Sequence, residues 1–293
     1  MRSGSRRQAA KLVAGTGLKY YTSIMCPTPS SEEIQLVFGT LSASPDSEKY
    51  LYELLSPDEQ ERSARFKFAK HRTSFVVARG LLRIVLGNYM NAKPAAIDFQ
   101  YGPCGKPVVK GAPQVHFNVS HSEQVVLYGL RLDHEIGVDI ERIRPMDDLE
   151  GIARRFFSPA ECRDLLAIPE QHRTKAFFDC WTRKEAFIKF LGTGLSFPLH
   201  RFQVTLGPGQ PVQLIHVDGQ PSGSRFLRDI APCDSHSAAV ASEGRDSRLR
   251  VWRLEGPEEG HARVEMAARS GKELDGPEFA IEEIDQRRGR KKE

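Results

Sequence analysis

An internal repeat is the feature of this sequence that most restricts its fold. Three short motifs return in the same order at offsets of 101 or 102 residues: EIQL at 33–36 as EIGV at 135–138, SPDE at 56–59 as SPAE at 158–161, and HRT at 71–73 as HRT at 172–174. Each match is short, but the shared order and the nearly constant offset indicate a duplicated unit. We therefore expect two related halves.

Each half is predicted to begin with a strand and to continue with two helices and further strands. The SPDE and SPAE motifs open a helix with a capping box, in which Ser56 or Ser158 caps the helix and Glu59 or Glu161 follows three residues later. A longer amphipathic helix is predicted over 72–86. Strands are predicted at 97–101, 115–119, 125–132, 202–206 and 212–217. The expected class is α+β, with two pseudosymmetric halves, each an antiparallel sheet packed against helices, and an active site between them.

Composition limits where these halves begin and end. Of the 293 residues, 40% are hydrophobic and 27% are charged, as in an ordinary globular protein. The two ends are poor in large apolar residues, which predicts a disordered leader over 1–32 and a disordered charged tail over 256–293. Between them we expect an N-terminal half over 33–132 and a C-terminal half over 133–255. The basic start of the chain leaves a second interpretation open, an organelle-targeting peptide.

Charge and cysteine usage narrow the classes of function. The formal net charge is +4, from 42 basic and 38 acidic residues, which is too small for a nucleic-acid-binding protein. No apolar run of about 18 residues is present, so we expect no membrane-spanning helix. The five cysteines are odd in number and lack zinc-site spacing, which indicates free thiols in a reducing, cytoplasmic setting.

Two acids on one strand form the sharpest local motif. In the segment at 136–141 (IGVDIE) the apolar side chains point into a core, whereas Asp139 and Glu141 share the opposite face. Two like charges this close repel each other unless a hard cation such as Mg²⁺ binds between them. A solvent-facing strand surface is the alternative. The repeat favours the cation, because the corresponding residues Val37 and Gly39 show that the architecture does not require acids here.

A second motif, WTRKEAFIK at 181–189, is predicted to lie on a helix. Helical spacing makes Lys184, Glu185 and Lys189 neighbours on successive turns. A surface ion pair between Glu185 and Lys189 is the simpler interpretation, but it leaves Lys184 and Trp181 without a role.

Two shorter motifs carry polar groups. FNVSH at 117–121 places Ser120 and His121 near the end of a strand, and GKP at 105–107 predicts a turn that offers backbone amides and one cation. Taken alone, a structural histidine and an ordinary turn explain them equally well.

In this order and spacing, the motifs resemble those of the Sfp-type 4′-phosphopantetheinyl transferases. The matching segments are 105–107, 117–121, 137–141, 156–161 (FFSPAE), 181–189 and 192–197 (GTGLSF), and the resemblance covers roughly residues 33–206. It implies an enzyme that transfers the 4′-phosphopantetheine group from coenzyme A to a serine of an apo-carrier protein and releases 3′,5′-ADP. Such enzymes serve fatty-acid, polyketide or nonribosomal-peptide biosynthesis, act on acidic carrier proteins, and are typically monomers in this double-half class.

The resemblance implies a role for each matched residue. Asp139, Glu141 and Glu185 match magnesium ligands, and Asp139, Glu185 and Lys189 match catalytic groups. The residues that match coenzyme A contacts are Arg62, Gly105, Lys106, Pro107, Ser120, His121, Lys184 and Lys189. Lys70 and Arg79 are further candidates of the same kind.

The sequence departs from the family pattern in two places. Glu59 stands where some members have a lysine, which predicts a weaker cationic grip on the 3′-phosphate, and Glu123 replaces a glycine. Two other functions fit part of the pattern. A different magnesium-dependent phosphotransferase or nuclease would need a basic stripe with interleaved aromatic residues, which is missing. A non-catalytic coenzyme A- or carrier-binding protein would be expected to have lost a carboxylate or Lys189, and none is lost.

Overall fold

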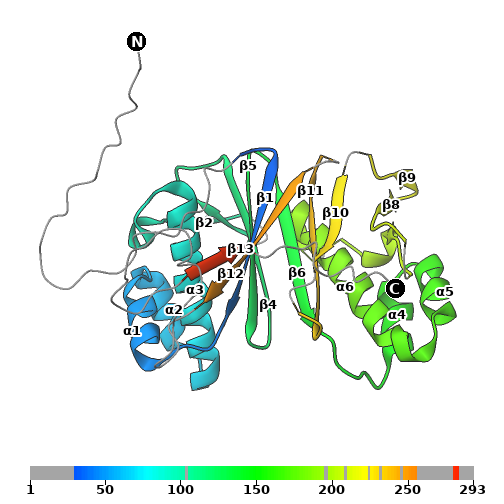
Figure 1. Ribbon diagram of the computed structural model, residues 1–293, viewed down its shortest axis with the longest axis horizontal. Coiled ribbons are helices and arrows are strands. Elements are labelled where there is room, and N and C mark those ends of the chain that lie inside the picture. The colour runs from blue at the N-terminus through cyan, green and yellow to red at the C-terminus, as the bar shows by residue number, and fades with distance from the viewer. Residues whose placement is uncertain are drawn as a thin grey trace, which may run out of the picture.

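The computed structural model describes residues 30–102, 105–194, 197–207, 210–223, 225–230, 233–244 and 247–255, together with the backbone of 280–283. Two sheets face each other in the middle of the molecule, and helices cover the outer side of each (Figure 1). The first half holds β1 (Glu33–Thr40), α1 (Pro45–Glu53), α2 (Pro57–Ala64), α3 (Ala69–Met90), β2 (Phe99–Tyr101), β3 (Pro107–Val109), β4 (Val115–Ser122) and β5 (Val125–Leu132). Short 3₁₀ turns lie at Pro94–Ala96 and Leu199–Arg201.

The second half repeats this order. It holds β6 (Ile136–Arg142), α4 (Leu149–Phe156), α5 (Pro159–Ala167), α6 (Glu170–Leu191), β7 (Phe202–Val204), β8 (Leu214–Val217), β9 (Gln220–Pro221), β10 (Arg225–Ile230) and β11 (His236–Glu243), and it is followed by β12 (Arg248–Glu255) and β13 (Ala280–Glu283). Both predicted capping boxes are present, at the starts of α2 and α5. The predicted helix over 72–86 is confirmed and extends to both sides as α3, and the predicted strands lie within a few residues of β2, β4, β5, β7 and β8.

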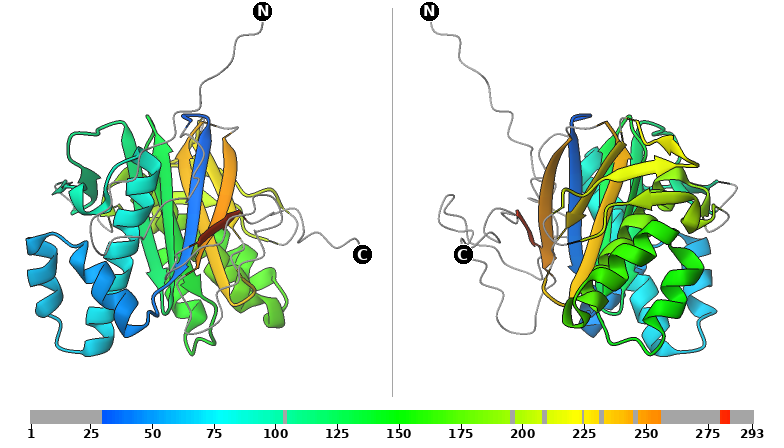
Figure 2. Two further views of the ribbon diagram at one scale, coloured as in Figure 1. Left: turned by 60° about the vertical axis from the view of Figure 1, so that its left-hand side comes forward. Right: turned by 90° about the vertical axis from the view of Figure 1, so that its right-hand side faces the viewer.

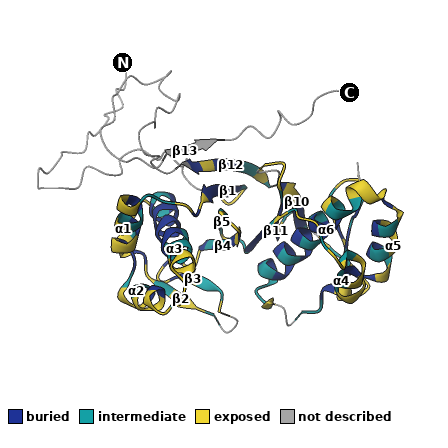
Figure 3. Ribbon diagram, turned by 90° about the horizontal axis from the view of Figure 1, so that it is seen from below, coloured by how far each residue is buried: buried dark blue, intermediate teal, exposed yellow. Residues whose placement is uncertain are grey.

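Three apolar clusters hold the layers together. One lies between α3 and the five-stranded sheet β13-β12-β1-β5-β4, and a second lies between α6 and the three-stranded sheet β10-β11-β6. The third joins the two sheets, where Leu36 of β1 and Val138 of β6 are both fully buried. Seen from below, buried residues (dark blue) are prominent on α3 and on α6, which flank the strands on either side (Figure 3). The α+β class with two related halves is therefore confirmed.

Strand β12 does not stay with the half that precedes it. The sequence assigned 133–255 to the second half, yet β12 pairs with β1 of the first half, and this pairing is parallel, whereas every other strand pair of the two main sheets is antiparallel. The strand can lie here because both of its faces become buried: Val251 joins the cluster between the sheets, and Leu254 joins the cluster under α3. Figure 2 shows β12 alongside β1 in both views.

A buried ion pair ties the capped helix to the long helix in each half. In the first half, Arg83 on α3 lies 2.7 Å from Glu59 on α2. In the second half, Lys184 on α6 lies 2.8 Å from Glu161 on α5. All four side chains are at most 2% exposed. Because an unpaired buried charge is very costly, each cation helps to fix its long helix against its capped helix.

The predicted leader at 1–32 and tail at 256–293 lie almost wholly outside the described residues. Within the tail, Ala280–Glu283 forms β13 and pairs with β12. Among the helices that the structure describes, none is long and apolar enough to cross a membrane.

Candidate functional site

The site is built where α6 crosses β6, and a glycine makes that crossing close. A Cβ atom on Gly137 would lie 2.1 Å from the carbonyl oxygen of Ala186 and 2.2 Å from the amide nitrogen of Phe190, distances that only glycine can avoid. The face of β6 that meets α6 continues with Asp139 and Glu141, as predicted from the alternation. The crossing therefore brings the acids of β6 beneath the polar side of α6.

Asp139 is the most buried acid of this face, with 3% of its surface exposed. Its Oδ1 accepts hydrogen bonds from Lys189 Nζ at 2.6 Å and from Ser120 Oγ at 2.8 Å. Its Oδ2 is also buried and has no partner among the described residues. Burial raises the pKa of Asp139, and the ammonium of Lys189 opposes that rise.

Glu141 and Glu185 complete the acidic group. Glu141 Oε2 accepts a hydrogen bond from Ser122 Oγ at 2.9 Å, and burial raises its pKa. Burial, followed by the negative charge of Asp139, raises the pKa of Glu185 to about 7. Because Asp139 and Glu141 both raise the pKa of Glu185, the three acids lie near one another. Among them, Lys189 forms its ion pair with Asp139.

This group has the chemistry of a cation site without forming a complete ligand set. Carboxylate oxygens suit a hard divalent ion, and the three acids outnumber the ammonium that pairs with them. In the described part of the chain, however, no three His, Cys, Asp or Glu side chains are close enough together to hold a metal. The ammonium of Lys189 already supplies a positive charge to Asp139, the most buried of the acids, at 2.6 Å. The predicted metal ligands therefore stay a prediction.

Ser120 and His121 lie at the same seam, on β4. Ser120 accepts a hydrogen bond from Lys189 at 2.9 Å and donates one to Asp139. His121 is exposed, and the desolvation of its ring followed by the charge of Lys189 lowers its pKa. An imidazole that is neutral near pH 7 can accept or donate a hydrogen bond beside the acids.

The predicted turn at 105–107 is present, but its cation is already engaged. Gly105 has a positive φ of 77° and Pro107 begins β3, so the turn carries Lys106 across to the second half. There the ammonium lies 2.6 Å from Glu135 Oε2 and donates to the carbonyl oxygens of Ile136 and Lys189 at 3.2 and 3.3 Å. Lys106 thus ties the first half to the carboxyl end of α6.

Glu135 is part of this tie and was not singled out from the sequence. A hydrogen bond from His116, reinforced by Lys106, lowers the pKa of Glu135 to about 2. The sequence placed Glu135 in the repeated motif at 135–138 but gave its side chain no role, and only the fold reveals that role.

Lys184 does not reach the seam. It is fully buried in the second half, where it pairs with Glu161 and donates to the carbonyl oxygens of Leu199 and Phe202 at 2.9 and 2.7 Å. The helical spacing placed Lys184 next to Glu185 correctly, but consecutive residues on a helix point about 100° apart. The assignment of Lys184 to coenzyme A is therefore corrected: this lysine is a structural cation.

The remaining predicted cations lie in the first half, on α2 and α3. Arg62 on α2 is exposed, and its guanidinium lies 5.2 Å from the ring centre of Phe75. Lys70 is also exposed, whereas Arg79 is paired with Glu59 at 3.3 Å. Glu59 is buried in its capping box, so the acid at this position serves the helix start and its ion pairs.

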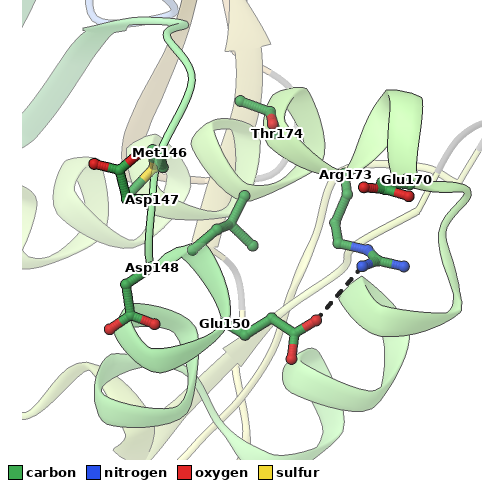
Figure 4. A pocket seen from close by; sticks show the side chains of 8 residues that line it. Met146, Asp147, Asp148, Glu150, Glu170, Arg173 and Thr174 are labelled. Carbon is green, nitrogen blue, oxygen red and sulfur yellow. Dashed lines mark ion pairs between the residues drawn. The ribbon is translucent and has the colours of Figure 1, made fainter.

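A cavity of about 390 Å³ lies apart from this seam, between the start of α4 and the start of α6 (Figure 4). Its lining residues are Met146, Asp147, Asp148, Leu149, Glu150, Glu170, Arg173 and Thr174. Arg173 pairs with Glu150 at 3.5 Å across it. None of the predicted site residues lines this cavity, so we take the acids under α6 as the candidate site.

Comparison with known proteins decides the family. Residues 42–129 match the 4′-phosphopantetheinyl transferase N-terminal family, and residues 135–241 match the 4′-phosphopantetheinyl transferase superfamily. The 4′-phosphopantetheinyl transferase HetI of Nostoc sp. is 35% identical over 225 residues, which cover 76% of this chain and 92% of that protein. The chain belongs to the 4′-phosphopantetheinyl transferase superfamily.

Two further relatives agree. The 4′-phosphopantetheinyl transferase Sfp of Bacillus subtilis is 37% identical over 66% of this chain and 77% of its own length. A human L-aminoadipate-semialdehyde dehydrogenase-phosphopantetheinyl transferase is 26% identical over 74% of this chain and 76% of its own length. The boundary between the two matched families falls at 129–135, between the two halves of the fold.

Proposed function

We propose that this transferase moves the 4′-phosphopantetheine arm of coenzyme A onto a serine of an apo-carrier protein and releases 3′,5′-ADP. The observation that carries the proposal is the group under α6, where Asp139, Glu141 and Glu185 meet Lys189. A carboxyl group whose pKa lies near 7 can accept a proton at neutral pH. An adjacent ammonium can stabilise negative charge on a leaving phosphate.

The proposed reaction forms one bond and breaks another at the β-phosphorus of coenzyme A. The carrier serine oxygen attacks this phosphorus while Glu185 accepts the serine proton. The bond to the bridging oxygen of the pyrophosphate breaks, and Lys189 stabilises the 3′,5′-ADP that leaves. Asp139 holds Lys189 in place through its 2.6 Å ion pair.

The same residues suit the metal that the family resemblance implies. Asp139, Glu141 and Glu185 would hold Mg²⁺, and Oδ2 of Asp139, which has no partner among the described residues, is a buried oxygen available to it. When bound, the ion neutralises charge on the pyrophosphate and supports transfer. We further propose that Ser120, His121, Arg62 and the turn at 105–107 contact the 3′-phosphoadenosine part of coenzyme A.

The partners and the location follow from the same proposal. Acidic acyl, peptidyl or polyketide carrier domains are the expected protein substrates, and the enzyme is expected to act as a monomer in the cytoplasm. Cys162, Cys180 and Cys233 are free thiols, which agrees with a reducing compartment.

The test is a labelling reaction with fluorescent coenzyme A and a panel of purified apo-carrier domains. We expect label on at least one carrier, none on its serine-to-alanine variant, and loss of labelling in EDTA that added Mg²⁺ restores. Absence of label on every carrier would contradict the transfer. Undiminished labelling in EDTA would contradict the metal alone.

A further inference from the structure

The free edge of β6 is paired with side chains instead of with another strand. β6 ends the three-stranded sheet, and a sheet edge that is buried must find partners for its amides. Three alternate residues of β4, which we call the β4 polar row, supply them: Asn118 accepts from Val138 N at 2.9 Å, Ser120 from Ile140 N at 3.4 Å, and Ser122 from Arg142 N at 3.0 Å. The two sheets are thus joined at this seam through side chains.

The two serines of this row also hold the acids. Ser120 Oγ donates to Asp139 Oδ1 at 2.8 Å, and Ser122 Oγ donates to Glu141 Oε2 at 2.9 Å. In both cases the hydroxyl accepts from one backbone amide and donates to the acid that directly precedes that amide. A serine hydroxyl has one hydrogen, so the amide directs that hydrogen toward the carboxylate.

The arrangement fixes which oxygen of each acid is engaged. At Asp139 the serine and the lysine both bind Oδ1, which leaves Oδ2 buried and without a partner in the described chain. At Glu141 the serine binds Oε2. At the third position of the row the residue before Val138 is Gly137, where α6 packs closely. The β4 polar row therefore extends to the close contact between Gly137 and α6, which lies beside the acids.

We propose that Ser122 is a positioning residue for Glu141, and that the β4 polar row couples the docking of the two halves to the orientation of the acids. Ser122 is the informative member, because Ser120 also contacts Lys189 and is assigned to coenzyme A above. Its side chain is 8% exposed and lies behind Glu141, so it acts through that acid. The inference rests on the proposed function, in which Glu141 binds the metal.

The test measures Mn²⁺ binding to the full chain, by electron paramagnetic resonance of the free ion, without coenzyme A. Loss of a hydrogen bond that orients a ligand weakens metal binding by about 10–100-fold, and we expect this for Ser122→Ala. Threonine and valine side chains have nearly the same shape, but only threonine has a hydroxyl group. Ser122→Thr and Ser122→Val are therefore a matched pair of variants. We expect Thr to retain binding and Val to lose it.

Ser237→Ala is the matched control. Ser237 is a buried serine that lies opposite Glu141 on β11, but its hydroxyl donates to Asp179 at 2.6 Å. We expect it to bind Mn²⁺ like the wild type. Hydrogen exchange of the Arg142 amide gives a second readout, and it should be faster in Ser122→Ala and Ser122→Val but not in Ser122→Thr.

The outcomes separate this inference from the proposed function. Faster exchange at Arg142 with unchanged Mn²⁺ affinity in Ser122→Ala would reduce Ser122 to a purely structural residue and overturn the inference. Equal affinities of the Thr and Val variants would overturn it too. If the wild type neither binds Mn²⁺ nor labels a carrier, the proposed function fails and takes this inference with it.

Discussion

In the first half, Arg83 pairs with the capping-box acid Glu59 and donates to the carbonyl oxygen of Ile97 at 2.7 Å. In the second half, Lys184 pairs with the capping-box acid Glu161 and donates to the carbonyl oxygen of Leu199 at 2.9 Å. Each cation also lies over a phenylalanine ring, Phe99 or Phe202 respectively. The two halves thus repeat this set of contacts around a buried cation, which we call the cage, at offsets of 101–103 residues, close to the 101 or 102 of the sequence motifs.

The strand beside the cage does not repeat its chemistry. The positions of Asp139 and Glu141 are occupied by Val37 and Gly39 in the first half, and the position of Glu185 by the fully buried Ile84. The first half therefore packs α3 on its strand through apolar contacts, whereas the second half places ionisable groups in the same space. The difference teaches that the duplicated scaffold needs the cage, while the acids serve something other than folding.

The largest effect is expected on activity, when an acid of the second half is replaced. A separate variant replaces its counterpart in the first half. We expect Asp139→Ala to lower carrier labelling by about 10³–10⁴-fold while the fold persists. Val37→Ala should instead lower the free energy of unfolding by about 1–2 kcal/mol, through lost burial, and leave the activity of the folded protein unchanged. Labelling rates and urea denaturation measure the two. An active Asp139→Ala enzyme would remove the distinction between the halves.

Loss of the buried cation should lower the free energy of unfolding by a similar amount in the two halves. Lys184→Met and Arg83→Met each leave a buried glutamate without its cation, and we expect each to lower the free energy of unfolding by about 3–4 kcal/mol. Urea denaturation at pH 7 measures this, and labelling per folded molecule should change little. A Lys184→Met protein of wild-type stability that no longer binds coenzyme A would restore the ligand role for Lys184.

Lys106 offers a contact of another kind, because it crosses from one half to the other. Lys106→Met should lower the free energy of unfolding by about 2 kcal/mol at pH 7, as hydrogen bonds from a charged donor are lost. The lowered pKa of Glu135, about 2, contributes stability above its ordinary value of 4.5 that disappears as pH falls toward 2. The difference between wild type and variant should therefore shrink between pH 4.5 and 2. A difference that is constant over that range would contradict the ion pair.

The smallest expected effect measures how much a buried acid lowers the free energy of unfolding. The pKa of Glu185, about 7, lies above its ordinary value of 4.5, so protonation favours the folded state and stability falls as pH rises from 4.5 to 7. Glu185→Gln should therefore raise the free energy of unfolding of the metal-free protein by about 1 kcal/mol at pH 8, which allows for the partial exposure of the carboxylate. Little gain is expected at pH 4.5. Urea denaturation in EDTA at both pH values checks this, and an equal gain at both would contradict it.

The sequence predicted those parts of the fold that depend on local signals. The capping boxes at Ser56 and Ser158, the alternation over 136–141 and the offset of the motifs each reflect short-range physics, so the helix starts, the facing of Asp139 and the two halves were predicted. The sequence also singled out the acids and Lys189 from their spacing on one strand and one helix, and their roles stay predictions.

What escaped prediction depends on contacts between distant segments. Both Lys184 and Lys189 lie on α6, and the helical pattern alone does not show which of them points into the core. Lys184 does so, and there it pairs with Glu161 of α5. The amides of β6 reveal their need for partners only when β4 lies against them, so Ser122 carried no signal. The parallel pairing of β12 likewise depends on an edge of β1 that local patterns do not reveal.

That parallel pairing means that the repeat unit and the structural unit are not the same piece of chain. A fragment ending after β5 would keep the whole first repeat yet expose one long side of β1, and a fragment beginning at β6 would contain β12 without the β1 strand that covers one of its edges. A cut between the repeats should therefore produce two pieces that reassemble with each other, and neither should behave as an independent copy of the ancestral unit. Because β12 joins the end of the second repeat to the first strand of the first repeat, we expect the two halves to unfold together.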